Sequence, residues 1–315
     1  MGAIRHLIAA LALCTCAAVA QAQTYITVLT GGTSGVYYPL GVALSKIYSE
    51  AIPGAKTSVQ ATKASAENLN LLQAGRGEVG FSLGDAVTQA WTGNEEAGFK
   101  QKLDKLRALA AIYPNYIQIV ASKESGIRTL QDLRGKRLSV GAPRSGTELN
   151  ARAVLAAAGL SYADLGKVEY LPFGESVELM KNRQLDATLQ SAGLGVSSIR
   201  DLATNVPIVV VPVPPEVVTK IGDPAYQPAV IPAGTYSGQD QDVPTVAVRN
   251  ILVTHSGVPE EVVYRMTKSM FEHLDELVAA HTAAKGIKLE EATKGLPIPL
   301  HPGAERYYRE VGLIR

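Results

Sequence analysis

The sequence has 315 residues, of which 46% are hydrophobic and 19% charged, with 30 basic residues against 29 acidic ones. A formal net charge of +1 argues against a nucleic-acid-binding surface, which needs a basic excess to neutralise phosphates. Any anion site must therefore be local. The length is ample for two domains, each with its own hydrophobic core.

The first 22 residues have the pattern of an export signal. Arg5 belongs to a short basic start, residues 7–20 are almost wholly apolar, and residues 20–22 fit a small-x-small cleavage site. The apolar run is short for a membrane span, which needs about 20 residues. Cleavage there shortens the chain from 315 to 293 residues and removes both cysteines, Cys14 and Cys16. We therefore expect a free periplasmic protein without disulfides.

Strand-like and helical patterns alternate along the chain. The expected strands are residues 25–29, 58–61, 79–83, 106–113, 117–121, 138–141, 168–171, 187–190, 208–211 and 246–254. The expected helices are residues 36–50, 66–74, 85–91, 147–158, 176–182, 196–202, 260–277 and 304–311. This alternation predicts parallel sheets covered by helices.

The alternation breaks once, in residues 212–244, where seven prolines predict a loop-rich connection. We expect an α/β protein with two lobes joined by a two-strand hinge. Lobe I comprises residues 23–115 plus 244–315, and lobe II comprises residues 116–243. Ligands of such sheets bind beyond the carboxyl ends of the strands, so the cleft between the lobes is the expected site.

Three strand-to-helix turns in this pattern are rich in glycine. They lie at residues 30–39, 140–148 and 190–193, and each also carries a hydroxyl side chain. Glycine lets a backbone approach a ligand closely, and a helix start offers unpaired N–H groups that attract carboxylates and phosphates. Ordinary helix capping would explain either of the first two turns alone. One such turn in each expected lobe favours a shared anion site.

Several side chains near the turns could complete this site. Arg144 could pair with a carboxylate through two hydrogen bonds, or lie solvated on the rim. The tyrosines Tyr37, Tyr38, Tyr113 and Tyr116 could line the cleft, or pack in the core with their hydroxyls satisfied locally.

Three further candidates follow expected strands. Ser65 and Asn68 lie at the start of the helix over residues 66–74, and capping alone would explain Ser65. Asp85 could cap its own helix or contact the amine of a ligand.

Catalytic and metal-binding patterns are poor. The histidines lack metal-ligand spacing, and neither a Gly-x-Ser-x-Gly elbow nor a complete dinucleotide-binding pattern is present. We expect no metal, no cofactor and no enzymatic activity. A periplasmic transferase with Ser34 or Ser145 as nucleophile remains an alternative, although no base is evident. A sensor module that reports a bound solute to a membrane receptor is another.

The combination of motifs resembles the TAXI-class solute-binding subunits of tripartite ATP-independent periplasmic (TRAP) transporters. The resemblance covers the expected mature chain. It is carried by residues 31–41 (GGTSGVYYPLG), 67–69 (ENL), 133–137 (LRGKR), 145–147 (SGT), 231–236 (IPAGTY), 242–246 (DVPTV) and 301–304 (HPGA).

The resemblance implies a type II periplasmic binding-protein fold and a small organic ligand. That ligand is often a carboxylate such as glutamate or 2-oxoglutarate, delivered to the membrane permease subunits of a TRAP transporter. We expect a monomer. Lys63 and Arg144 are cationic where this family often has small residues, which could favour an extra carboxylate on the ligand. By position, the ligand shell would include Gly32, Thr33, Ser34, Tyr37, Ser65, Asn68, Ser145, Gly146, Thr147 and a residue near Ala192.

Overall fold

The computed structural model describes residues 23–315, and the expected export signal lies outside the described residues. The strands are β1 (Thr24–Leu29), β2 (Ala55–Gln60), β3 (Val79–Leu83), β4 (Leu106–Ser122), β5 (Arg137–Ser139), β6 (Lys167–Glu169), β7 (Ala187–Ala192), β8 (Ile208–Val211), β9 (Tyr226–Ile231) and β10 (Val243–His255). The α-helices are α1 (Tyr37–Ala51), α2 (Ser65–Gln73), α3 (Gly84–Thr92), α4 (Gly146–Ala157), α5 (Phe173–Lys181), α6 (Ser197–Asn205), α7 (Pro215–Ile221), α8 (Glu260–Glu272), α9 (Leu274–Ala280) and α10 (Pro302–Glu310).

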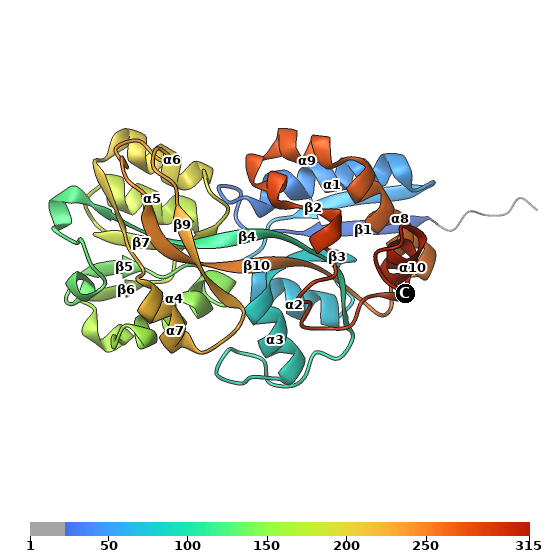
Figure 1. Cartoon of the computed structure of the whole chain (residues 1–315), viewed down its shortest axis with the longest axis horizontal. Coiled ribbons are helices and arrows are strands. Elements are labelled where there is room, and N and C mark those ends of the chain that lie inside the picture. Colours follow the sequence, from blue (N-terminus) through green and yellow to red (C-terminus); the bar gives the residue numbers. More distant parts are fainter. Residues whose placement is uncertain (1–22) are drawn as a thin grey trace, which may run out of the picture.

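One ten-stranded sheet runs through the molecule in the order β2-β1-β3-β10-β4-β7-β5-β6, with β8 paired to β4 and β9 paired to β10. The pairings of β1 with β2 and β3, and of β5 with β6 and β7, are parallel. The long central strands β4 and β10 are antiparallel to each other and pass between the two ends of the sheet (Figure 1).

Two halves of the molecule follow from this topology. The first half carries β1–β3 with α1–α3 and α8–α10, and the second half carries β5–β9 with α4–α7 (Figure 1). In the first half α1, α8 and α9 lie on one side of the sheet and α2 and α3 on the other. Every residue of β3 is buried, as expected for a strand covered on both faces.

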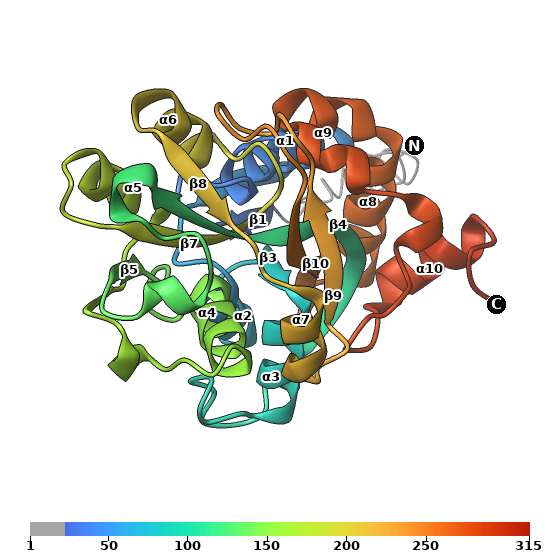
Figure 2. The ribbon, with the colours of Figure 1, turned by 60° about the vertical axis from the view of Figure 1, so that its left-hand side comes forward.

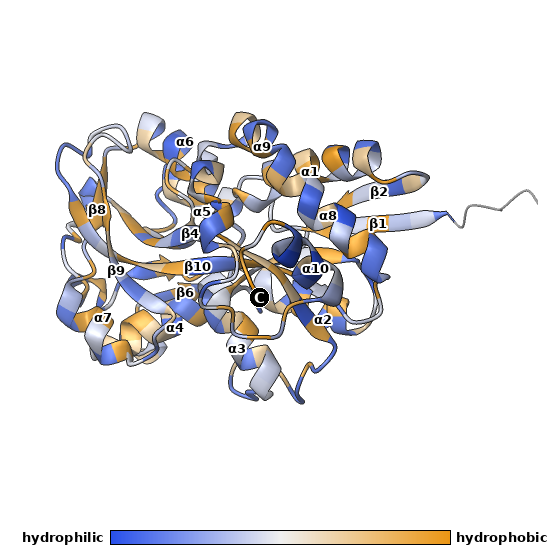
Figure 3. Ribbon diagram, turned by 45° about the vertical axis from the view of Figure 1, so that its right-hand side comes forward, coloured by the Kyte–Doolittle hydropathy of each residue, from blue (hydrophilic) through white to orange (hydrophobic). Residues whose placement is uncertain are grey.

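Helix α10 shows how a polar segment joins the core. Most of its residues are hydrophilic, and it is largely blue in Figure 3. Its buried residues include Ala304, Tyr307 and Tyr308, so one face packs on the protein while the charged face meets solvent. Tyr308 also donates a hydrogen bond from its hydroxyl to the carbonyl oxygen of Leu109 on β4 (2.7 Å).

The structure departs from the expected elements in three places. The two strands expected on either side of Pro114 form one strand, β4. Residues 212–244 contain α7 and β9, because Pro215 is accommodated at a helix start and Pro228 lies on an edge strand, where its missing N–H costs no ladder bond. The helix expected over residues 260–277 is interrupted at His273, whose backbone leaves the helical region.

The pairing of β4 with β10 is irregular near the middle of both strands. Arg249 pairs with Pro114 but Ile251 pairs with Ala111, so the register shifts around Asn250. The Asn250 side chain donates a hydrogen bond from Nδ2 to the carbonyl oxygen of Tyr113 (2.8 Å), which satisfies a backbone acceptor within the irregularity. We call this feature the central bulge. Figure 2 shows β4, β9 and β10 running together through this region.

Candidate functional site

A cavity lies between the two halves of the molecule. Its volume is about 100 Å³, measured as the space that the centre of a water molecule can reach. The first half contributes residues at the ends of β1, β2 and β3, and the second half contributes residues at the ends of β5, β6 and β7. The carboxyl ends of parallel strands meet at one edge of a sheet, which explains why these turns converge.

Four helices begin at the cavity wall. Tyr37 of α1, Ser65 of α2, Gly146 of α4 and Phe173 of α5 are each the first residue of their helix, and all line the cavity. The first N–H groups of a helix have no partner inside it, and its dipole is positive at that end. The wall of the cavity is therefore rich in positions where a small anion is stabilised.

Buried hydroxyl groups add hydrogen-bond donors to this wall. The exposed fractions are 1% for Ser65, 4% for Ser145 and 5% for Thr147. Ser65 Oγ accepts a hydrogen bond from the Leu83 amide (3.1 Å), and Ser145 Oγ accepts one from the Glu148 amide (3.1 Å). Each of these two bonds uses a lone pair of the hydroxyl, so its hydrogen can still be donated to a ligand.

The remaining wall is mostly apolar. Val36, Leu83, Ala142 and Phe173 contribute aliphatic or aromatic surface. Lys63 is the one cationic side chain among the lining residues, and no Asp or Glu is among them. The cavity therefore suits a small anion with an apolar body.

A buried polar network closes the cavity beside the central bulge. The Tyr37 hydroxyl donates to Asn250 Oδ1 (2.5 Å), and Asn250 Nδ2 donates to Asn115 Oδ1 (2.9 Å). Asn115 Nδ2 donates to the carbonyl oxygen of Ser191 on β7 (3.0 Å). Burial raises the pKa of Tyr37 well above its ordinary value, so the phenol stays neutral and acts as a donor.

Replacement of Tyr37 by phenylalanine tests this network. We expect Tyr37→Phe to lower the free energy of unfolding by about 1–3 kcal/mol, because Asn250 Oδ1 would be left buried without its donor. Urea unfolding of the ligand-free protein measures the change. The exposed Tyr25→Phe is the matched control, with an expected change within about 0.5 kcal/mol. Equal stability of both variants would show that the network contributes nothing.

Asp85 lies in a second buried cluster, away from the cavity lining. Its Oδ2 accepts hydrogen bonds from Asn150 Nδ2 (2.8 Å) and from the Tyr226 hydroxyl (2.7 Å), whereas its Oδ1 has no partner among residues 23–315. Asn150 Oδ1 accepts a hydrogen bond from the hydroxyl of Ser191, which lines the cavity (2.7 Å). Burial raises the pKa of Asp85 to about 6. Asp85 thus joins the first half to the second rather than facing the cavity.

The structure brings half of the expected site residues to the cavity. Those lining it are Gly32, Tyr37, Ser65, Ser145, Gly146, Thr147 and Ala192. Those outside the lining are Thr33, Ser34, Asn68, Asp85, Tyr113, Tyr116 and Arg144.

The residues outside the lining have other environments. Asn68 Nδ2 donates to the carbonyl oxygens of Thr30 (2.7 Å) and Phe81 (2.8 Å), so it links the turn after β1 to the middle of β3. Thr33 is exposed and Ser34 is half-buried, with the Ser34 carbonyl accepting a hydrogen bond from Ser197 Oγ (2.9 Å).

The other three lie near the crossing strands or on the surface. Tyr113 is buried in the core beside the central bulge, and Tyr116 is half-buried on β4. Arg144 is exposed at the turn before α4, with a positive φ of 60°.

Sequence reasoning missed several lining residues. Pro172 and Phe173 follow β6, and the rule that was applied to the glycine turns would have found this strand-to-helix turn as well. Asn115 lies within the long strand β4, where no local signal marks it. Ser191 precedes Ala192 at the end of β7 in the third expected turn, where only Ala192 is an expected ligand residue.

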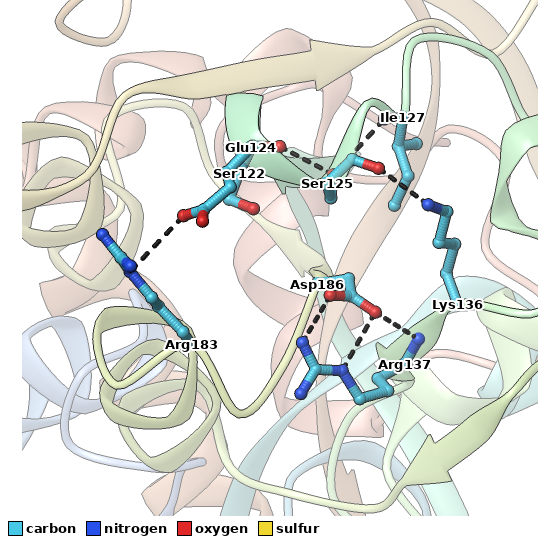
Figure 4. A network of polar contacts seen from close by, with 8 residues as sticks. All are labelled: Ser122, Glu124, Ser125, Ile127, Lys136, Arg137, Arg183 and Asp186. Atoms are coloured by element: carbon cyan, nitrogen blue, oxygen red, sulfur yellow. Dashed lines mark hydrogen bonds and ion pairs between the residues drawn. The ribbon is translucent and has the colours of Figure 1, made fainter.

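A second hollow, of about 490 Å³, lies in the second half near the start of β5 and β7. Figure 4 shows four of its charged side chains, Glu124, Arg137, Arg183 and Asp186, which form two pairs. Arg137 holds Asp186 through Nη2–Oδ1 (2.6 Å) and Nε–Oδ2 (3.1 Å), which lowers the pKa of that carboxyl. Arg183 lies 3.4 Å from a Glu124 oxygen. These pairs join the ends of strands and helices within the second half. We therefore take the cavity between the halves as the candidate site.

Within residues 23–315, no helix has the length and apolarity that crossing a membrane requires. In the same residues, no cluster of three or more His, Cys, Asp or Glu side chains could hold a metal ion.

The fold is that of a two-lobed binding protein. One similar structure is PhnD1 from Prochlorococcus marinus with methylphosphonate, at a TM-score of 0.59 and 11% identity, covering 93% of this chain and 100% of that one. Another is the alkanesulfonate-binding protein SsuA from Xanthomonas axonopodis pv. citri, bound to MOPS, with a TM-score of 0.51 and 14% identity. The match covers 91% of this chain and 83% of that one. A third is a candidate L-cystine ABC transporter protein from Listeria monocytogenes, with a TM-score of 0.52 and 15% identity. The match covers 84% of this chain and 98% of that one.

These similarities confirm the expected fold class. The model of the NMT1-like family matches residues 28–312. The chain therefore belongs to the NMT1-like family.

Proposed function

We propose that this protein is an extracytoplasmic solute-binding protein that captures a small carboxylate between two lobes and delivers it to membrane permease subunits. The observation that carries the proposal is the meeting of four helix starts and the buried hydroxyls of Ser65, Ser145 and Thr147 at one cavity between the halves. Two-lobed relatives that bind methylphosphonate or MOPS support the same role for this fold.

Lobe movement is part of this proposal. The lobes would be residues 23–115 plus 244–315 and residues 116–243, linked by β4 and β10. Contacts between the halves, such as the hydrogen bond from Ser197 Oγ to the Ser34 carbonyl, support a closed arrangement in this structure. Closure would remove the ligand from water, and opening would release it to the permease.

The class of transporter is the finer part of the proposal. The motifs that resemble TAXI-class proteins support a TRAP-type permease, in the periplasm of the cell. An ABC-type permease is the competing candidate, because a structural neighbour is an ABC transporter protein. Uptake of ligand into vesicles that carry the permease encoded beside this gene distinguishes the two. Uptake that persists without ATP supports the TRAP type, and strict ATP dependence supports the ABC type.

The alternatives predict different results. The transferase hypothesis requires a base beside Ser145, whereas its Oγ accepts a hydrogen bond from the Glu148 amide. Covalent labelling of Ser145 by a serine-directed probe would favour the enzyme. A sensor module would bind the same ligand, but its deletion would leave uptake of that ligand unchanged.

Titration calorimetry of refolded, ligand-stripped protein tests ligand capture. The panel contains glutamate, 2-oxoglutarate and other small mono- and dicarboxylates, with methylphosphonate and methanesulfonate as competing anions. We expect heat with at least one carboxylate. Absence of heat with all carboxylates would contradict the proposal.

Variants at the start of α4 test the location of the site. We expect Ser145→Ala and Thr147→Val each to weaken binding about 10- to 100-fold, because a hydrogen bond to a charged group contributes about 1.5–3 kcal/mol. Ser161→Ala, which alters an exposed hydroxyl of the second half, is the control and should bind like the unaltered protein. Unchanged affinity in both cavity variants would place the ligand elsewhere.

A further inference from the structure

The cavity wall has an uneven distribution of charge. Its lining residues supply hydroxyls, helix starts and one lysine, but no carboxylate. Asp85, the acidic residue expected at the ligand, uses its Oδ2 to accept hydrogen bonds from Asn150 and Tyr226 and does not line the cavity. Glu67 accepts a hydrogen bond from the amide of Lys63 (2.5 Å) and is not a lining residue either. A ligand in the cavity therefore meets no acidic side chain from either half.

This pattern discriminates between two kinds of small acid. An amino acid brings an ammonium group, which must be paired or fully hydrogen-bonded when it leaves water. Lys63 is the only ionisable lining residue besides Tyr37, and its charge would repel an ammonium. The four helix starts carry the same sign of dipole and would repel it as well.

The same wall suits oxygen acceptors. A carboxylate and a neighbouring oxo or hydroxyl oxygen both accept hydrogen bonds, which N–H groups and hydroxyls can supply. The Thr147 side chain is 95% buried and lines the cavity, and its hydroxyl makes no hydrogen bond to any residue between 23 and 315. An acceptor on the ligand would satisfy it.

We infer that the ligand is a small organic acid without an amino group, such as a 2-oxo or 2-hydroxy acid, rather than an amino acid. This inference rests on the proposed function and narrows its ligand class. It removes glutamate from the candidates and retains 2-oxoglutarate.

Matched ligand pairs test the inference by calorimetry on the ligand-stripped full-length mature protein. The pairs are 2-oxoglutarate with glutamate, pyruvate with alanine, and 2-oxoisovalerate with valine. We expect at least one oxo acid to bind about 100-fold more tightly than its amino acid, a difference of about 2.8 kcal/mol, because the ammonium group would be buried without a partner. Equal affinities, or tighter binding of the amino acids, overturn the inference and leave the proposed function intact. If no member binds, the inference is overturned, and the proposed function is overturned as well only if the wider carboxylate panel also gives no heat.

A charge-reversal variant gives a second readout. Lys63→Glu places a carboxylate at the cavity wall, so it should reduce the ratio of oxo-acid to amino-acid affinity about 5-fold, with the modest size set by the exposure of Lys63. Lys56→Glu makes the same change of net charge at an exposed position of β2, outside the lining, and should leave the ratio unchanged. If Lys63→Glu leaves the ratio of oxo-acid to amino-acid affinity as unchanged as Lys56→Glu does, the charge of Lys63 does not contribute to discrimination against amino acids.

Discussion

Replacement of Gly146 by valine is expected to weaken ligand binding by about 100-fold while the ligand-free protein remains folded. A Cβ atom at Gly146 would lie 2.5 Å from Ser65 Oγ and 2.6 Å from Leu83 Cδ1. Gly146 belongs to the second half, and both contacts belong to the first. Overpacking of this kind costs about 1–3 kcal/mol, and separation of the halves relieves it.

The measurement combines calorimetric titration with thermal unfolding of the ligand-free variant. The ligand affinity of Gly146→Ala should lie between those of the unaltered protein and Gly146→Val, about 10-fold weaker than in the unaltered protein. Ala156→Val, at an exposed position of the same helix, controls for a β-branched residue in α4. If Gly146→Val bound ligand as tightly as the unaltered protein, the closed arrangement would not be the binding state.

Ligand binding is also expected to tighten about 10-fold as the pH falls from 7.5 to 5. The pKa of Asp85 is raised to about 6 in this structure, by burial first and with a contribution from the charge of Asp223, against an ordinary value of 3.8. Opening would separate Asp85 from Asn150 and Tyr226 and return its pKa toward that ordinary value. Closure therefore takes up a proton between these two pKa values.

The sign of this effect follows from the raised pKa. The stabilisation of the closed arrangement by protonated Asp85 is fully present below about pH 3.8. It is lost as the pH rises through about 6. Asp85→Asn keeps an acceptor for Asn150 and Tyr226 without the charge, so it should bind ligand equally at pH 5 and pH 7.5. Calorimetry at both pH values, with a ligand that stays ionised throughout, measures the difference. A pH dependence that survives in Asp85→Asn would assign it to another group.

Much of the fold could be predicted because its signals are local. Buried parallel strands read as short apolar runs, such as residues 79–83, and helix starts follow them at regular intervals. Residues 212–244, with seven prolines, are predicted to be rich in loops but contain α7 and β9. Pro215 lies at a helix start and Pro228 on an edge strand, and both positions tolerate proline.

The lining of the cavity could be predicted from the sequence where it is formed by turns and not where it is formed by tertiary contacts. Gly32, Ser145 and Thr147 belong to glycine-rich turns that the sequence marks plainly, and they line the cavity. Asn115 also lines the cavity, because it lies on the part of β4 that passes the cavity. This placement depends on the assembled sheet and not on the local sequence. Asn68 and Asp85 were expected at the ligand because polar residues at helix starts look alike, whether they bind a solute or other parts of the protein.

The register shift around Asn250 has a mechanical consequence. Regular antiparallel strands resist bending because each ladder bond fixes its neighbours, whereas strands out of register have fewer bonds to strain. Both connecting strands of this protein carry the irregularity at the same level. The register shifts a second time between Leu252 and Val253. We therefore expect bending of the connecting strands to concentrate between Arg249 and Val253 of β10 and in the facing part of β4.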